Sequence, residues 1–123
     1  MAGAHLEGLP LHHELLARGA RLQQTTTTAP AYRLYALSGT PPARAGLVRV
    51  SSEGRAIEVE VYRLPRAEVG ELLATVPPPL ALGSVWLASG ELVRGFVCEA
   101  IGSEGAEDIS ECGGWRAYVA SLA

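Results

Sequence analysis

A short segment rich in small residues, at the start of the chain, carries the residues best suited to chemistry. Gly3, Ala4 and Gly8 surround His5 with side chains too small to shield the backbone. Glycine permits backbone conformations that turn peptide N–H groups toward a bound anion. Histidine is the side chain that most readily gains and loses a proton near neutral pH. The segment predicts a loop that holds an anionic substrate against His5, and the alternative is an ordinary turn with a surface histidine.

Other histidines and acidic residues are weaker candidates. His12 and His13 fall on a predicted helix, where neighbouring residues diverge by about 100° and make a poor metal pair. Glu58 and Glu60 alternate along a predicted strand, a pattern typical of a solvated sheet face. The sequence contains no lysine, which excludes mechanisms that need a catalytic lysine. We expect no metal site and no cofactor.

Composition indicates one globular domain. The 123 residues are 48% hydrophobic and 19% charged, which is enough for a single core. A net charge of -3 without a basic run argues against a nucleic-acid partner. No apolar run reaches the ~20 residues of a membrane span, and the first residues lack the layout of a signal peptide. Cys98 and Cys112 lack metal-ligand spacing, so we expect a cytoplasmic protein with reduced, buried cysteines and no membrane partner.

Helices and strands are both needed to position this loop. Alternating apolar residues predict four strand regions, at 32–37, 46–50, 57–64 and a hairpin over 82–98. Apolar residues at helical spacing predict three helices, at 11–18, 65–76 and 115–122. The segment 102–107 is predicted to be a polar loop. This order favours an α+β fold around a small, mostly antiparallel sheet or barrel with flanking helices.

Arginines and tyrosines on these elements are candidate substrate contacts. Arg33 shares a strand with Tyr32 and Tyr35, and it faces either a pocket or solvent. The two tyrosines are either pocket residues or plain core. Arg116 follows Trp115, an expected packing anchor, and projects from its edge. A planar guanidinium can hold a carboxylate through two hydrogen bonds, so either arginine suits an anionic substrate.

Five short motifs in a fixed order carry a resemblance to a known family. They are GAHL at 3–6, TAPAYRLY at 28–35, IEVEV at 57–61, GFV at 95–97 and GGWRAY at 113–118. Over essentially its whole length, the chain resembles the C-terminal domain of allophanate hydrolase. The resemblance implies a γ-glutamylcyclotransferase-like fold, a small β-barrel with flanking helices. It also implies urea catabolism, in which an amidase domain removes ammonia from allophanate and the C-terminal domain decarboxylates the resulting N-carboxycarbamate.

The resemblance places the family's catalytic histidine at His5. We expect backbone N–H groups around Gly3, Ala4 and Leu6 to hold the oxygens of a small anionic substrate. One arginine, Arg33 or Arg116, would assist them, while His5 delivers a proton to the leaving nitrogen. The family's amidase machinery needs a lysine, so the expected partner is a separate amidase domain or subunit.

Two other functions stay open. The absence of a clear second catalytic group favours a non-enzymatic module that binds a small anion or docks on an amidase. A γ-glutamylcyclotransferase is least favoured, because residues 72–90 hold no acidic residue where those enzymes carry a catalytic glutamate. Glu60 or Glu99 would have to replace it. A homodimer is also open, because an unpaired strand edge can associate.

Overall fold

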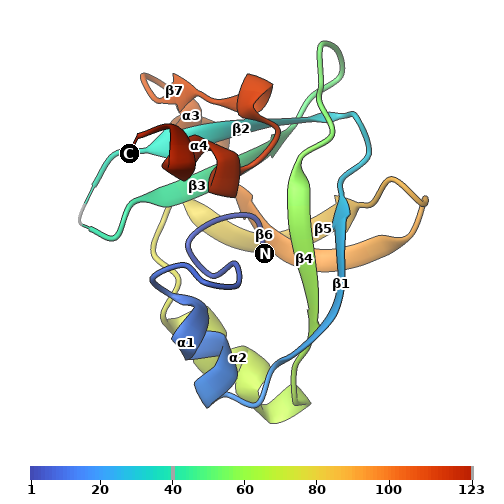
Figure 1. Ribbon diagram of the computed structural model, residues 1–123, viewed down its shortest axis with the longest axis vertical. Coiled ribbons are helices and arrows are strands. Elements are labelled where there is room, and N and C mark those ends of the chain that lie inside the picture. Colours follow the sequence, from blue (N-terminus) through green and yellow to red (C-terminus); the bar gives the residue numbers. More distant parts are fainter. Residues whose placement is uncertain (40, 123) are drawn as a thin grey trace.

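Three small antiparallel sheets form the framework of the computed structural model, which describes residues 1–39 and 41–122 (Figure 1). One sheet pairs β1 (Arg21–Thr27) with β4 (Glu58–Arg63), and another pairs β5 (Leu80–Trp86) with β6 (Leu92–Cys98). In the third, β2 (Tyr32–Leu37) lies between β3 (Arg44–Arg49) and β7 (Glu107–Asp108). The predicted hairpin and the predicted strand over 32–37 are confirmed.

Short helices lie at the two ends of the domain. At one end, α1 (His12–Ala17) and α2 (Arg66–Ala74) are side by side, and at the other α4 (Trp115–Ser121) packs near β2 and β3 (Figure 1). All three predicted helices are confirmed with somewhat shorter bounds. The predicted loop at 102–107 is wrong in part, because α3 (Ala100–Ser103) enters it and β7 begins at its last residue. The 3-10 turn η1 (Ser110–Cys112) then leads toward α4.

The strands of the described residues do not close into the predicted barrel. The outer edge of β4 is taken by non-strand segments: the Met1 amino group donates to the Glu60 carbonyl at 2.7 Å, and the Glu58 amide donates to the Gly113 carbonyl at 2.8 Å. Isolated bridges such as Thr28 with Leu87 join separate sheets. Because the edges are filled in this way, the fold is an α+β domain with small antiparallel sheets.

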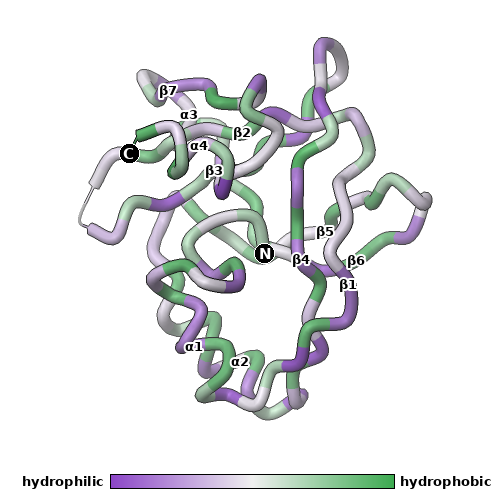
Figure 2. Tube along the Cα trace, in the orientation of Figure 1, coloured by the Kyte–Doolittle hydropathy of each residue, from purple (hydrophilic) through white to green (hydrophobic). Residues whose placement is uncertain are grey.

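The hydrophobic core consists of two clusters. The larger one joins β2, β3 and α4, and its buried members are Leu6, Tyr32, Leu34, Leu47, Ile57, Val85, Ile109 and Trp115. The smaller one joins α1 and α2 through Leu15, Ala20 and Leu72. Apolar and polar residues intermingle along both of these helices (Figure 2), as expected where only one helix face is buried. Trp115 is 3% exposed, which confirms it as a packing anchor.

Thr28 connects β1 to the larger cluster, and its hydroxyl is the basis of a stability prediction. The side chain is fully buried; it accepts a hydrogen bond from the Ile57 amide at 3.0 Å and donates to the Ala29 carbonyl. Thr28→Val keeps the shape but leaves that amide unpaired, which costs about 1–3 kcal/mol. We expect this loss in the free energy of unfolding in urea. Thr25→Val, at an exposed position of β1, is the control, and equal stability of the two variants would contradict the prediction.

Candidate functional site

The loop around His5 is shaped by short turns. The Leu6 amide donates to the Gly3 carbonyl at 2.9 Å, and the Leu11 amide donates to the Ala4 carbonyl at 2.8 Å. Leu6 is fully buried and anchors the loop in the core. By contrast, the amides of Gly3, Ala4 and His5 donate to no backbone or side-chain acceptor in residues 1–39 and 41–122. Three consecutive unpaired N–H groups are a suitable arrangement for binding an anion.

The imidazole of His5 is buried and rests on a carboxylate. His5 is 7% exposed, and its Nε2 lies 3.1 Å from Oε1 of Glu14 on α1. Burial lowers the pKa of His5 below its usual 6.5 and outweighs Glu14, which raises it. The positive charges of Arg44 and of the Met1 amino group lower this pKa further. His5 is therefore neutral at neutral pH, and its imidazolium form is a stronger acid than ordinary histidine.

A small cavity of about 30 Å³ lies beside His5. Gly3, Ala4, His5 and Arg44 line it, together with apolar side chains such as Leu47 and Phe96. A cavity that holds one water needs roughly 10–15 Å³, so this space holds a small group rather than a whole substrate. The unpaired amides and the histidine thus belong to residues that line one small cavity.

Arg44 extends this cavity toward a larger groove. It begins β3 and makes no ion pair or side-chain hydrogen bond with the rest of the described chain. The groove has a volume of about 320 Å³, and Arg44 and Leu80 line both it and the His5 cavity. We call it the proline groove, after the residues that form much of its wall: Pro41, Pro77, Pro78 and Pro79. A guanidinium without a carboxylate partner at this junction is well placed for an anionic ligand.

The candidate residues on β2 lie outside the cavity beside His5. Arg33 donates to the Asp108 carboxylate from Nε at 2.8 Å, and it also bonds the Glu53 carbonyl. Although burial opposes it, the hydrogen bonds from Arg33 and Ser110 lower the pKa of Asp108. Tyr32 is fully buried and its hydroxyl accepts the Trp86 amide, whereas Tyr35 is half-buried. None of the three β2 candidates lines the cavity beside His5.

Arg116 lies close to the His5 loop but is used in holding it. Its Nη2 lies 2.9 Å from Oε2 of Glu60, and its Nη1 donates to the Glu7 carbonyl at 2.6 Å. Glu60 is 3% exposed, so the expected solvated face is wrong at this position. The reason is that the N-terminal loop and Arg116 of α4 cover that face of β4. The sequence places all three segments far apart, so local alternation could not reveal the cover.

Arg44 and Glu14 are the site residues that sequence reasoning missed. A weak signal exists for each of them. Arg44 follows the Pro41–Pro42 pair and starts a strand without an acidic neighbour in sequence, and Glu14 lies on the predicted helix directly after the His5 loop. Their proximity to His5 depends on tertiary contacts between the loop, α1 and β3, which the pattern of residues does not encode locally.

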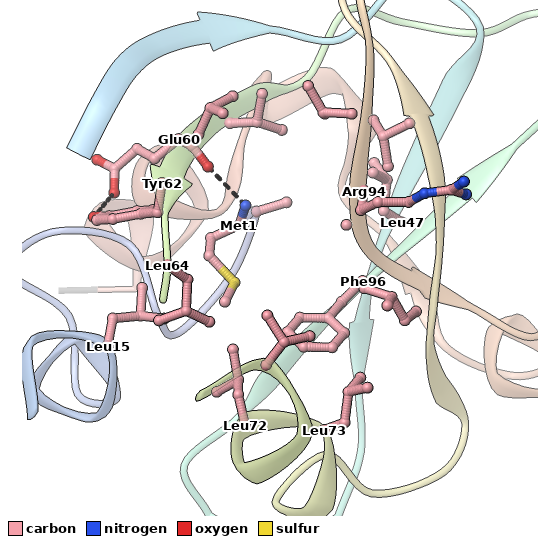
Figure 3. Close-up of a pocket in the computed structure, with 18 of the residues that line it drawn as sticks. Met1, Leu15, Leu47, Glu60, Tyr62, Leu64, Leu72, Leu73, Arg94 and Phe96 are labelled. Carbon is pink, nitrogen blue, oxygen red and sulfur yellow. Dashed lines mark hydrogen bonds between the residues drawn. The ribbon is translucent and has the colours of Figure 1, made fainter. Parts of the chain in front are cut away.

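Another cavity, the apolar chamber, adjoins the His5 cavity. Its volume is about 320 Å³, and its walls come from the N-terminal residues, α1, α2 and β3 to β6 (Figure 3). Figure 3 shows the Met1 side chain pointing into it between Leu15, Leu72 and Phe96. His5 is not among its lining residues. The chamber lies between parts of the two core clusters, and Met1, Ala2, Leu47 and Phe96 line both it and the His5 cavity.

The remaining features of residues 1–39 and 41–122 concern metal ligands, helix length and cysteines. In that part of the chain, no group of three or more His, Cys, Asp or Glu side chains is arranged to hold a metal ion. None of its helices is long and apolar enough to cross a membrane. Both cysteines are free; Cys98 is buried as expected, but Cys112 is exposed because it lies in the surface turn η1.

Comparison with known proteins agrees with the resemblance seen in the motifs. A family model described as the allophanate hydrolase C-terminal domain matches residues 1–120. The chain belongs to this family. Urea amidolyases from Saccharomyces cerevisiae and Lachancea kluyveri are 45% and 43% identical to it, over 99% and 97% of the chain. The chain spans only 7% of the length of each, so in these relatives the allophanate hydrolase C-terminal domain is a small part of a larger protein.

Solved structures of similar proteins share the fold. Kluyveromyces lactis allophanate hydrolase is 41% identical with a TM-score of 0.95, and the match covers 99% of this chain and 21% of that one. A protein described as specific to uropathogenic E. coli is 32% identical with a TM-score of 0.89. That match covers 97% of this chain and 91% of the bacterial one. The domain therefore occurs within large proteins and also as nearly the whole of a short chain.

Proposed function

We propose that this domain acts in urea and allophanate degradation by decarboxylating N-carboxycarbamate or a similar small carboxylated amide. One observation carries the proposal. The buried His5 imidazole, the unpaired amides of residues 3–5 and the Arg44 guanidinium all belong to residues that line one small cavity. Membership of a family whose named relatives include an allophanate hydrolase supports the choice of substrate class.

The chemistry requires a proton at nitrogen. When the carbon–nitrogen bond of the carbamate breaks, its electron pair goes to nitrogen, which takes up the proton, and the carboxylate leaves as carbon dioxide. The imidazolium form of His5 supplies this proton and is regenerated from water. A positioned acid of this kind contributes about 10²–10⁴ in rate. The lowered pKa of His5 makes that form a strong donor, although it lowers the fraction of protonated imidazole at neutral pH.

The remaining groups hold the substrate. The guanidinium of Arg44 and the amides of Gly3 and Ala4 bind carboxylate oxygens, and the apolar cavity walls limit water. Because the cavity is only about 30 Å³, the rest of the substrate would extend into the proline groove. The His5 end of the space would then hold the scissile bond.

Carbon dioxide release from freshly formed N-carboxycarbamate tests the proposal. An amidase that consumes allophanate generates the substrate in place, and bicarbonate appearance is followed with and without this chain. We expect faster release with the chain, and a rate that does not depend on the chain would contradict the proposal. A reaction with the chain but no amidase gives the background.

A second candidate is a module that docks on an amidase domain. The size of the proline groove, about 320 Å³ against about 30 Å³ for the His5 cavity, favours this candidate because the groove accommodates a peptide segment. Tight binding to the amidase with no change in the rate of release would support it.

The γ-glutamylcyclotransferase activity, the related fold assignment and the homodimer are the remaining expectations. For a γ-glutamylcyclotransferase, both oxygens of Glu60 are already engaged by hydrogen bonds, and Glu99 is exposed. Formation of 5-oxoproline from γ-glutamyl substrates would be needed to revive that function. We retain the γ-glutamylcyclotransferase-like fold assignment and the homodimer as proposals.

A further inference from the structure

We infer that Glu60 and Arg116 are positioning residues that clamp the backbone two residues after His5 and so fix its imidazole. The effect on catalysis rests on the proposed function, whereas the effect on the His5 side chain does not. The clamp acts on Glu7, whose amide donates to Oε1 of Glu60 at 2.8 Å. The carbonyl of the same residue accepts Nη1 of Arg116 at 2.6 Å.

The two clamp residues also hold each other. Nη2 of Arg116 lies 2.9 Å from Oε2 of Glu60, and the Glu60 carboxylate is almost completely buried. Hydrogen bonds between charged groups are about twice as strong as those between neutral groups. Since β4 supplies Glu60 and α4 supplies Arg116, the loop is tied to two elements distant from it in sequence.

A second set of hydrogen bonds links Glu60 to the backbone of His5 itself. Tyr62 donates to Oε1 of Glu60 at 2.7 Å, so its oxygen is free to accept a bond from Nδ1 of His12 at 3.3 Å. The same His12 nitrogen lies 3.2 Å from the His5 carbonyl. Burial and then the Glu60 hydrogen bond raise the pKa of Tyr62, which keeps its hydroxyl protonated as a donor. The peptide of His5 and that of Glu7 therefore belong to one hydrogen-bond network.

The role is one of positioning because Glu60 and Arg116 do not line the His5 cavity. The charged groups that act on the His5 imidazole are Glu14 on α1, Arg44 on β3 and the Met1 amino group. Neither clamp residue is among them. Arg116→Met removes none of these charges, so a change in the His5 pKa of that variant reports movement of the loop. Glu60→Gln can also act through the Met1 amino group, because burial lowers the pKa of that group to about 6 and the Glu60 charge opposes this. Arg116→Met is therefore the decisive variant.

NMR titration of the His5 imidazole tests the clamp directly. We expect Glu60→Gln and Arg116→Met to raise the His5 pKa toward the unperturbed value of about 6.5, because the loosened loop lets water reach the ring. Arg116→Lys retains the charge and is expected to give a smaller rise. Arg18→Met is the matched control: it removes an arginine that pairs with Glu68 at 3.6 Å and leaves the loop contacts intact.

Catalysis provides the second readout. In the release assay, Glu60→Gln and Arg116→Met are expected to lower the rate about 10- to 100-fold, and Arg116→Lys is expected to restore part of it. Circular dichroism checks that each variant folds. If Glu60→Gln and Arg116→Met do not fold, Arg116→Lys is compared with the wild type instead.

Two results would overturn the clamp. One is a His5 pKa that stays at the wild-type value in the folded variants, and the other is an equal rise in Arg18→Met, which would indicate general loosening. If the His5 pKa rises as expected but the wild-type chain does not accelerate release, the clamp is supported and the proposed function fails.

Discussion

His5→Gln is expected to abolish the catalysed release of carbon dioxide, with a fall of about 10²- to 10⁴-fold in rate. Glutamine preserves the polarity and much of the size of the imidazole, and its side-chain N–H can still donate a hydrogen bond to Glu14. It cannot carry a proton to the substrate nitrogen. The rate difference therefore isolates proton delivery from binding in the cavity.

The control for this variant is His13→Gln. His13 is exposed on α1 and bonds only the Pro10 carbonyl among its described neighbours, so its loss should leave release unchanged. The wild-type rate is expected to fall as the pH rises through the His5 pKa, which lies below 6.5, because the acid form disappears. His5→Gln should lack this pH dependence. Release at the wild-type rate in His5→Gln would end the catalytic account.

Arg44→Met is expected to weaken substrate binding about 10- to 100-fold, measured as a rise in KM. This range corresponds to the roughly 1.5–3 kcal/mol that a hydrogen bond to a charged group contributes. Methionine retains an unbranched apolar side chain, so the packing along the cavity is largely kept. Arg44→Lys keeps the charge but loses the planar fork, and it should fall between methionine and the wild type.

The opposite end of the same strand provides the control. Arg49 is exposed at the end of β3, and Arg49→Met removes the same charge without touching the cavity. A KM that rises equally in both variants would indicate a general electrostatic effect and would contradict the assignment of Arg44.

The local pattern of apolar residues was sufficient to predict a helix or strand where that element buries one face against the core. The alternation of Tyr32, Leu34 and Ala36 predicted β2 with its observed bounds, and the helical spacing from Trp115 predicted α4. The turn at Ser89-Gly90 likewise predicted the β5–β6 hairpin. In each case, the information lies within a few residues, so sequence alone was enough.

Contacts between distant segments could not be read in this way. Glu60 alternates with apolar residues as a surface residue would, yet the loop at 3–8 and Arg116 bury it. Arg33 and Arg44 both lie near the start of a strand, but of the two only Arg44 lines the cavity beside His5. The predicted barrel failed for a related reason, because Met1 and Gly113 occupy the edge of β4 that closure would need.

The apolar chamber has a consequence for the response of the domain to hydrostatic pressure. The chamber is partly open to solvent, and its volume of about 320 Å³ is lined mostly by apolar side chains that offer water few hydrogen bonds; Glu60, Tyr62 and Arg94 are its polar lining residues. Unfolding eliminates the space that the apolar walls keep free of water, so the unfolded chain in water occupies the smaller molar volume. Compression should therefore shift the equilibrium toward unfolding more steeply than in a domain of equal length that has no such cavity.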